Sequence, residues 1–274
     1  MKVGKGNVMD TTMYDFFADF KQSGHVTKRY YKKLYEESIT HPEVFWSKMG
    51  KRIDWIKPYN KIKDVSFKKD DLHIRWYYDG TLNASVNCID RHLPQKANDT
   101  AIIFEADDPA MSTSITYQEL YNEVCQFSNL LKSKGVKKGD RVTIYMPMTQ
   151  DAVYAMLSCA RIGAVHSVVF GGFSPEALSG RIIDCDSHIV ITSDEGKRGG
   201  QIIPLKSNVD EALNKEGVTV ETVIVFRHTN NNVNMKRGRD IWAQDEQKEL
   251  PKDCEPQEMN AEDPLFILYT SGST

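Results

Sequence analysis

Residues 165–176 read VHSVVFGGFSPE, and this stretch decides the fold. The valine-rich run over 165–170 predicts a buried strand. The two glycines at 171–172 then permit a tight turn, because glycine adopts backbone conformations that other residues avoid. Ser174 and Pro175 follow as the capping residue and the first residue of a helix. A buried strand that passes through a glycine turn into a capped helix is the repeating unit of a parallel α/β sheet.

The same alternation extends to both sides of this unit. A capping box, Thr116 to Glu119, opens a helix that Gly135 closes, and Thr149 begins another that runs to Gly163. Strand-like segments lie beside these helices at 101–105, 141–148, 165–170, 188–192 and 218–226. Strands that alternate with such helices predict an α/β fold with a parallel, doubly wound sheet and flanking helices on both faces. Ligands of such sheets bind where the strands end.

The N-terminal third of the chain lacks this alternation. Residues 1–98 hold three of the four tryptophans and short amphipathic pieces, and we expect them to form a mainly helical or irregular cap. Thr40 and Pro42 resemble an N-cap and the residue that follows it, which predicts a helix start at 40–43. Residues 99–274 are expected to form the main domain.

Composition favours a globular protein that acts on small molecules. The 274 residues carry a net charge of −3, and Lys and Arg are spread along the chain rather than grouped. We therefore expect neither a nucleic-acid nor a membrane partner. No run approaches the ~18 apolar residues of a membrane span, and the N-terminus lacks the apolar core of a signal peptide. These observations predict a cytoplasmic protein.

Three turns at strand exits are candidates for ligand binding. The first holds Phe170, Gly171 and Gly172, where a ligand could approach the backbone next to a helix N-terminus. A tight turn chosen for packing alone is an equal alternative. The second, at 194–201, reads DEGKRGGQ and holds Arg198, Gly199, Gly200 and Gln201. The planar fork of an arginine suits a phosphate, and the competing interpretation is a solvated surface loop.

The third turn is TSGST, at the end of the apolar run FILY. The run predicts a buried strand over 265–269. Backbone N–H groups and hydroxyls of the turn suit the phosphates of a nucleotide triphosphate, although a bland Ser/Thr turn is as good an account on this string alone. The residues concerned are Thr270, Ser271, Gly272, Ser273 and Thr274.

Other polar groups receive structural assignments. His166 lies inside an apolar strand and is interpreted as a core histidine with a satisfied ring nitrogen rather than a catalytic base. The acidic pairs at 107–108 and 262–263 precede prolines, as turn residues do. Five cysteines without CxxC spacing disfavour a disulfide framework and a zinc site. No catalytic triad and no Walker loop is recognisable, so no catalytic or metal-binding residue is assigned.

Longer strings carry a resemblance to a known family. Residues 263–274, DPLFILYTSGST, resemble the opening of the nucleotide-binding signature of the adenylate-forming enzymes. The chain is similar to the AMP-forming acetyl-CoA synthetases in three further strings: 156–178 (MLSCARIGAVHSVVFGGFSPEAL), 82–93 (LNASVNCIDRHL) and 237–240 (RGRD). The resemblance covers nearly the whole chain from about Tyr30 onward.

The resemblance implies roles for the three turns. Residues 270–274 match the first half of the loop that handles ATP phosphates. Residues 170–172 match a turn that lines the CoA nucleotide site, and 198–201 match the segment that holds a CoA phosphate there. The family often has a second arginine where Gln201 stands, so the resemblance implies one fixed charge fewer and weaker CoA binding here, for which Lys197 would be the partial substitute.

The resemblance also implies a reaction. Acetate, ATP and CoA would be the substrates of an AMP-forming ligase that passes through acetyl-adenylate, with Mg²⁺ accompanying ATP. The catalytic lysine, the acyl pocket and the metal ligands of the family come after Thr274, so the 274 residues alone are expected to be an inactive fragment with an open sheet edge. Two alternatives stay open: a truncated, non-catalytic remnant with weak CoA or nucleotide binding, and a fragment of a propionyl-CoA synthetase.

Overall fold

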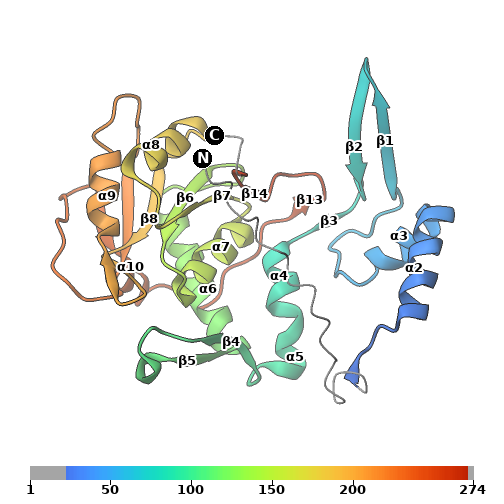
Figure 1. Cartoon of the computed structure of the whole chain (residues 1–274), viewed down its shortest axis with the longest axis horizontal. Helices are drawn as coiled ribbons and strands as arrows, with labels where there is room; N and C mark the ends of the chain where they lie inside the picture. The colour runs from blue at the N-terminus through green and yellow to red at the C-terminus, as the bar shows by residue number, and fades with distance from the viewer. Residues whose placement is uncertain (1–22, 271–274) are drawn as a thin grey trace, which may run out of the picture. The chain divides into compact units, whose positions relative to one another are not determined.

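The computed structural model describes residues 23–270 (Figure 1). The chain divides into two compact units, Met1–Lys51 and Arg52–Thr274. The described part of the first unit contains two helices, α2 (Lys28–Thr40) and α3 (Pro42–Gly50). The second unit contains the parallel sheet and its helices. Each unit is therefore described by itself, and the predicted domain boundary at 98/99 stays a prediction.

The predicted helix start at 40–43 is wrong in one detail. Pro42 is the first residue of α3, as expected, but its N-cap is His41. Thr40 instead ends α2, where its hydroxyl donates to the carbonyl oxygen of Glu36 at 2.8 Å. A threonine in the last turn of a helix finds its acceptor four residues back, so it is not available to cap the next helix.

The second unit is built on a six-stranded parallel sheet in the order β12-β11-β8-β6-β7-β14. This confirms the α/β fold. All adjacent pairs in this sheet are parallel. Its strands are β6 (Arg141–Met146), β7 (Val165–Phe170), β8 (Ile189–Ser193), β11 (Thr222–Phe226), β12 (Asp240–Trp242) and β14 (Phe266–Ile267).

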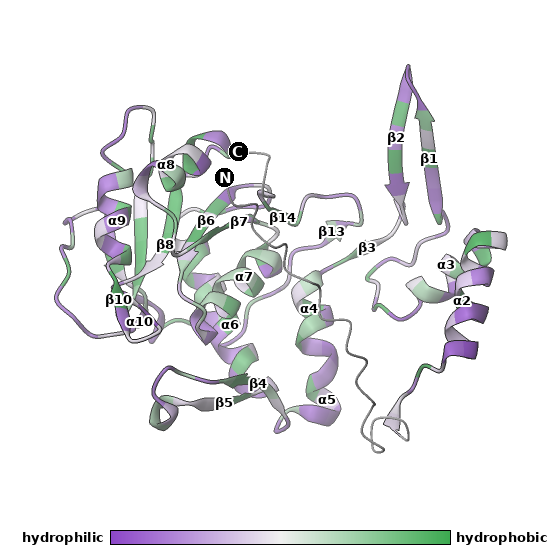
Figure 2. Cartoon of the chain, in the orientation of Figure 1, coloured by the Kyte–Doolittle hydropathy of each residue, from purple (hydrophilic) through white to green (hydrophobic). Residues whose placement is uncertain are grey.

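Helices cover both faces of this sheet (Figure 1). On one face α6, α7 and α10 pack against strand residues such as Ile144 and Ile224. On the other face α8 and α9 pack against Val223 and Val225. The sheet strands are mostly hydrophobic, whereas the helices mix hydrophobic and hydrophilic residues (Figure 2). The helices are α6 (Tyr117–Ser133), α7 (Gln150–Ile162), α8 (Pro175–Asp184), α9 (Leu205–Ala212) and α10 (Ala243–Gln247).

Local sequence signals explain where these helices begin and end. The capping box of α6 is present, with Thr116 and Glu119 each bonding the backbone of the other. Ser174 caps α8 by accepting the N–H of Ala177 at 3.3 Å. Gly163 ends α7 in the left-handed conformation, at φ +74°. The predicted helices are thereby confirmed, but the expected capping by Thr149 is wrong: it stands at the N-cap of α7, and its side chain makes no capping bond.

Two strand predictions need correction. The segment near 101–105 forms β4 (Thr100–Phe104), which pairs antiparallel with β5 (Thr113–Thr116) outside the parallel sheet. The connection 105–112, with the short helix η2 (Pro109–Met111), is too short for the crossover that parallel pairing needs. The run 265–269 was expected to be buried, yet β14 has two residues and Phe266 is 53% exposed. It lies at the sheet edge with β7 as its neighbour.

The segment 52–98 contains more strand than expected. Its first two strands, β1 (Lys63–Lys68) and β2 (Asp71–Trp76), form an antiparallel hairpin. Alternation places Val65, Phe67, Leu72 and Ile74 on one face of the hairpin. The remaining elements outside the parallel sheet are β3 (Thr81–Leu82), α4 (Ala84–Cys88), η1 (Asp90–His92), α5 (Leu93–Lys96), β9 (Gly196–Arg198), β10 (Gln201–Ile203) and β13 (Met259–Asn260).

A buried arginine anchors the segment 83–90 to α7. Arg161 is 2% exposed and donates to both carboxylate oxygens of Asp90, at 2.8 and 3.0 Å. Its Nε donates to the carbonyl oxygen of Cys254 at 2.7 Å, and its guanidinium lies 5.1 Å from the centroid of the Tyr121 ring. Asn83 adds a bond from its side-chain amide to the Arg161 carbonyl oxygen at 3.0 Å. Four separate segments therefore meet at one side chain.

Replacing Asp90 by Asn should lower the free energy of unfolding by about 3–5 kcal/mol, because it leaves a buried guanidinium without its counter-charge. Urea unfolding of the chain measures this. The control is Asp54→Asn, which removes a pair 3.5 Å long between exposed groups, Arg91 and Asp54, and should cost less than about 1 kcal/mol. Equal effects of the two substitutions would contradict the anchoring role of Arg161.

The hairpin carries a histidine held by two carboxylates. His73 Nε2 lies 2.9 Å from Asp64 and Nδ1 lies 3.0 Å from Asp71. The bond to Asp64 raises the pKa of His73 above 6.5, and the same bond holds the pKa of Asp64 below 3.8. The pair is therefore charged between these two values. The contribution of His73 is lost as the pH rises through its raised pKa, and that of Asp64 as the pH falls through its lowered one.

An NMR pH titration of the His73 ring should give a pKa above 6.5. Asp64→Asn should lower that pKa more than Asp71→Asn does, because Asp64 makes the larger contribution. A His73 pKa at or below 6.5, or a larger effect of Asp71, would show that the hairpin does not hold these groups as described.

Candidate functional site

The turn after β7 is held by a buried tyrosine. The hydroxyl of Tyr145 lies 2.7 Å from the carbonyl oxygen of Phe173 and 3.1 Å from that of Gly171, and it accepts from Asn208 at 3.1 Å. Tyr145 is fully buried, and burial raises the pKa of its phenol. Because the hydroxyl stays protonated, it donates to the turn. The sequence alone did not point to Tyr145, because a single tyrosine within an apolar strand gives no signal of a hydrogen bond to a distant turn.

Glycine is required in this turn for space. A Cβ at Gly171 would lie 3.1 Å from the carbonyl oxygen of Met146, where neighbouring β6 ends. A Cβ at Gly172 would lie 2.5 Å from Cε1 of Phe170. The glycines therefore allow the turn to close over β6 and allow the Phe170 ring to lie back over the turn.

The second predicted turn is an ordered hairpin rather than a loose loop. β9 and β10 pair antiparallel, with Arg198 opposite Gln201. Gly199 and Gly200 form the connection with φ of +57° and +75°, which a two-residue hairpin turn of this kind requires. The N–H of Gly200 donates weakly to Asp107, at 3.4 Å.

The structure brings the first two predicted turns together. The guanidinium of Arg198 lies over the ring of Phe170, 5.2 Å from its centroid. Phe170 is 49% exposed, so this pair lies at the surface. Arg198 forms no ion pair with a described residue, and its guanidinium is attracted to the face of the Phe170 ring. A free guanidinium beside an exposed aromatic ring suits an anionic ligand with a planar group.

A buried carboxylate holds the neighbouring strand exits. Asp194 directly follows β8, is fully buried and accepts the backbone N–H groups of Glu195, His228, Thr229 and Asn230 at 2.7–3.2 Å. Its own N–H donates to Phe226, at the end of β11. The loops after β8 and β11 are thereby fixed to each other. Sequence reasoning placed Asp194 in the second turn without recognising this role.

The string 237–240 serves the fold through a buried ion-pair network. The ammonium group of Lys206 is fully buried, 2.7 Å from Asp210 and 2.9 Å from Asp240. Arg239 bonds both of these carboxylates. Burial alone would raise the pKa of Asp240, but the bonds from Arg239 and Lys206 outweigh it and lower that pKa. The network fastens the loop before β12 to α9.

The third turn is described up to Thr270; Ser271, Gly272, Ser273 and Thr274 lie outside the described residues. The hydroxyl of Tyr269 donates to Asp184 of α8. Burial raises the pKa of Tyr269, and the bond to Asp184 adds to this. The guanidinium of Arg181, also on α8, lies 5.1 Å from the Tyr269 ring centroid. Tyr269 is therefore held against α8, the helix that follows the first turn.

His166 does not join this site. It is 9% exposed, and burial lowers its pKa to about 4. Its ring lies 5.8 Å from that of Phe266. The core assignment agrees with this position. The expectation of a satisfied ring nitrogen is wrong for Nδ1, which has no hydrogen-bond partner in the described part of the chain.

The acidic pairs are turn residues, as expected. Asp108 caps η2 by accepting the N–H of Ala110 at 3.0 Å. Asp263 pairs with Lys138 at 2.7 Å, and Glu262 accepts the N–H of Trp76 at 2.6 Å. Between residues 23 and 270 there is no group of three or more His, Cys, Asp or Glu side chains that could hold a metal ion.

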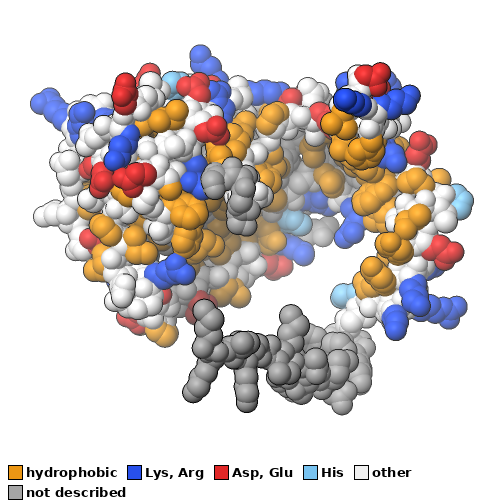
Figure 3. Space-filling model, turned by 45° about the horizontal axis from the view of Figure 1, so that its top comes forward, with side chains coloured by type: hydrophobic (Ala, Val, Ile, Leu, Met, Phe, Trp, Pro, Cys, Tyr) orange, Lys and Arg blue, Asp and Glu red, His pale blue; other side chains and the backbone are white. Residues whose placement is uncertain are grey.

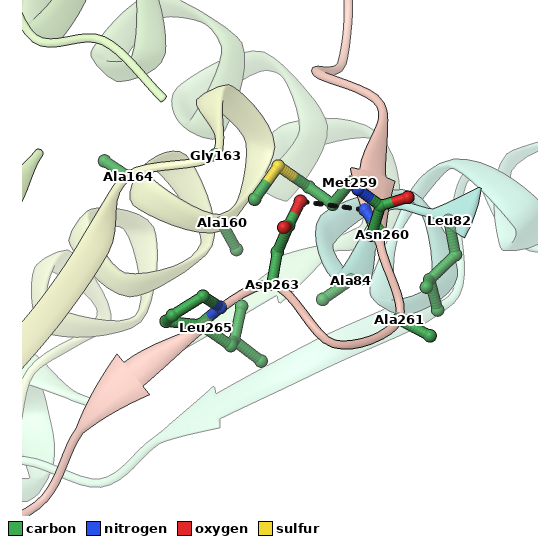
Figure 4. A pocket seen from close by; sticks show the side chains of 11 residues that line it. Leu82, Ala84, Ala160, Gly163, Ala164, Met259, Asn260, Ala261, Asp263 and Leu265 are labelled. Atoms are coloured by element: carbon green, nitrogen blue, oxygen red, sulfur yellow. Dashed lines mark hydrogen bonds between the residues drawn. The ribbon is translucent and has the colours of Figure 1, made fainter. Parts of the chain in front are cut away.

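A pocket of about 140 Å³ lies at the amino ends of the strands, away from the candidate turns (Figure 4). Gly163 and Ala164, which precede β7, and Leu265, which precedes β14, line it with Met259 and other small or apolar groups. It therefore lies at the amino ends of these strands, whereas the candidate turns lie at the carboxyl ends. Its volume is also below the ~300 Å³ at which ligand pockets for drug-sized molecules begin.

These features define a doubly wound α/β protein with its candidate site at the carboxyl ends of the strands, where ligands of this class bind. The family model described as AMP-binding enzyme matches residues 89–274, and that described as Acetyl-coenzyme A synthetase N-terminus matches residues 31–88. The chain belongs to the AMP-binding enzyme family. The resemblance found in the sequence strings is thereby confirmed.

Individual relatives agree with this assignment. The chain is 59% identical over 97% of its length to an acetyl-coenzyme A synthetase of Parvibaculum lavamentivorans, and 55% identical over 96% to one of Shewanella amazonensis. It covers 41% of each relative, so it spans about two fifths of their length. The solved acetoacetyl-CoA synthetase from Streptomyces lividans matches with a TM-score of 0.78 at 22% identity, covering 88% of this chain and 36% of that one. This last likeness supports the fold.

Within the described residues, none of the helices combines the length and the apolar character that a membrane crossing needs.

Gly172→Ala should displace the Phe170 ring and separate it from Arg198, because the new Cβ would lie 2.5 Å from the ring. The ring resonances of Phe170 in NMR spectra report this movement. The matched control is Gly180→Ala in the middle of α8, where the Cβ meets open space and should add up to about 1 kcal/mol of stability. Unchanged Phe170 resonances in Gly172→Ala would contradict the packing described for the turn.

Proposed function

We propose that this chain serves in an AMP-forming ligase that makes acetyl-CoA from acetate, ATP and CoA. In the first step a carboxylate oxygen attacks the α-phosphorus of ATP, and pyrophosphate leaves. In the second step the CoA thiolate attacks the acyl carbon of acetyl-adenylate, and AMP leaves. The proposal takes its substrates from the similar proteins, which are acetyl-coenzyme A synthetases.

The observation that carries the proposal is the stacking of Arg198 on Phe170. These residues come from two separate turns, and both were assigned to CoA by resemblance alone. Their contact at 5.2 Å forms one surface with a cation free of carboxylate partners and an exposed ring. In the proposed complex Arg198 binds a phosphate of CoA, and Phe170 lies against its base.

The end of β14 is the proposed approach to ATP. Thr270 is the first residue of the predicted turn TSGST, and in this proposal the N–H groups of that turn bind phosphate oxygens. The roles of Ser271, Gly272, Ser273 and Thr274 stay predictions. Mg²⁺ would accompany ATP, held by phosphate oxygens, water and one or two carboxylates. No residue is assigned to it, and no step is routed through it here.

The remaining partner proposals rest on surface and cysteine chemistry. On the face drawn in Figure 3, Lys and Arg side chains are interspersed with Asp and Glu, which does not favour nucleic-acid binding on that face. All five cysteines are free thiols, and four of them are buried. Free thiols are typical of a reducing compartment, and we propose a cytoplasmic location.

Arg198→Met should weaken CoA binding by about tenfold or more, since a hydrogen bond between charged groups contributes ~1.5–3 kcal/mol. Gln201→Arg should strengthen it, because the new cation lies opposite Arg198 in the hairpin. Calorimetric titration of CoA into the chain measures both effects. The control is Asn214→Arg, which adds the same charge beyond the other end of α9 and should leave CoA affinity unchanged.

The site would be overturned if Arg198→Met left the affinity for CoA unchanged. It would also be overturned if Asn214→Arg raised that affinity as much as Gln201→Arg does. The reaction itself is tested on the full product of the gene by acetate-dependent exchange of pyrophosphate into ATP. Absence of exchange, with CoA binding intact, would favour a non-catalytic remnant over a ligase.

A further inference from the structure

The turn after β7 directs two of its carbonyl groups toward the core. The carbonyl oxygens of Gly171 and Phe173 lie 3.1 and 2.7 Å from the hydroxyl of Tyr145, which is fully buried. All described peptide bonds are trans, so the N–H of the residue after each carbonyl points in the opposite direction. The N–H groups of Gly172 and Ser174 therefore point away from Tyr145.

These two N–H groups have no partner in the described part of the chain. The turn is closed by another bond, in which the N–H of Phe173 donates to the carbonyl oxygen of Phe170 at 2.9 Å. No described residue accepts a hydrogen bond from the N–H of Gly172 or Ser174, and both residues are exposed. Gly172 lies against the Phe170 ring, over which Arg198 lies. The turn therefore offers two free donors to a ligand at this surface.

Asn208 of α9 sets the direction of the bond from Tyr145. A phenol has one proton, and two carbonyl oxygens of the turn already compete for it, so the third neighbour of the hydroxyl has to donate. The side-chain amide of Asn208 does so, at 3.1 Å from the Tyr145 oxygen. Burial raises the pKa of the phenol, which keeps the proton on it. The proton of Tyr145 is thereby directed to the turn.

We propose that Tyr145 is a positioning residue for CoA binding, and that Asn208 makes it so by directing its proton to the turn. The proposal rests on the proposed function, because it takes CoA as the ligand of this turn. No other described group donates a hydrogen bond to the carbonyl oxygens of Gly171 and Phe173. Without the hydroxyl, the turn would populate other peptide orientations, and the affinity for CoA would fall by the factor by which the competent population falls.

The alternative is that Tyr145 only fills the space between the sheet and α9, where it packs against Leu205 and Val209. In that case a phenyl ring would serve as well, and CoA binding would not depend on where the phenol proton goes. The two accounts differ in the direction of one hydrogen bond. Substitutions at Asn208 change that direction while the tyrosine stays in place.

The test is a calorimetric titration of CoA into the chain and its variants. Tyr145→Phe should weaken CoA binding by about fivefold, as expected for one lost hydrogen bond. Asn208→Asp should weaken it by a similar factor, because a carboxylate accepts the phenol proton and so takes it from the turn. Asn208→Ala leaves that proton free to bond the turn, and its affinity for CoA should exceed that of Asn208→Asp by about threefold or more.

Two matched controls accompany these variants. Tyr154→Phe removes the hydroxyl of another buried tyrosine, on α7, and should leave the affinity for CoA unchanged. Ser207→Asp adds a carboxylate at the exposed neighbour of Asn208, and it measures how much of the effect of Asn208→Asp is repulsion of the anionic ligand. Should Tyr145→Phe fail to fold, the comparison of Asn208→Asp with Asn208→Ala takes its place.

The outcomes separate this proposal from the proposed function. The positioning role would be overturned, with the CoA site intact, if Tyr145→Phe bound CoA as the wild type does. It would also be overturned if Asn208→Asp weakened binding no more than Asn208→Ala or Ser207→Asp does.

If the wild-type chain binds no CoA, the CoA site is wrong, and hydrogen exchange of the Phe173 amide without ligand decides whether Tyr145 positions the turn. Exchange about fivefold faster in Asn208→Asp than in Asn208→Ala would support that role, and equal rates would overturn it.

Discussion

The parallel pairing of β6 with β7 and β8 is the constraint on which the rest of the structure depends. In parallel strands the carboxyl ends meet at one edge, so the segments after Met146, Phe170 and Ser193 must leave the sheet side by side. The backbone segments are crowded at this edge, which explains why a glycine and a buried tyrosine are found there. Gly171 lies so close to the end of β6 that a side chain would meet its backbone, and a buried tyrosine from β6 receives the turn.

Buried polar groups, rather than helices alone, hold the irregular segments against this sheet. Asp194 collects backbone N–H groups from the loops after β8 and β11, and Lys206 joins α9 to the loop before β12. Arg161 does the same for the segment 83–90. Each of these charges is costly to bury unless its partners are complete. The long family strings at 82–93 and 237–240 therefore carry structural partners, Asp90 and Asp240.

The charged residues of the candidate site are paired differently from the buried charges that hold the loops. Its two arginines, Arg198 and Arg181, lie over aromatic rings and pair with no described carboxylate. A guanidinium that lies over a ring keeps hydrogen-bond donors at its edge for a ligand, although Arg181 uses one of its own on the Ala177 carbonyl oxygen. The buried charges that support the sheet are paired with carboxylates, whereas the arginines at the candidate site are not. This difference agrees with a site for anionic, nucleotide-like ligands.

Local patterns in the sequence were enough to predict the alternation of strands and helices, the capping of α6 and α8 and the positions of the first two turns, because hydrophobic period, capping residues and glycines act over a few residues. Tertiary structure decided the rest. The pairing of β4 with β5, the exposure of β14 and the unsatisfied ring nitrogen of His166 depend on which neighbour each strand finds, which no local pattern encodes. The contact between Phe170 and Arg198 likewise joins segments far apart in the chain, and it exists because parallel strands bring their exits to one edge.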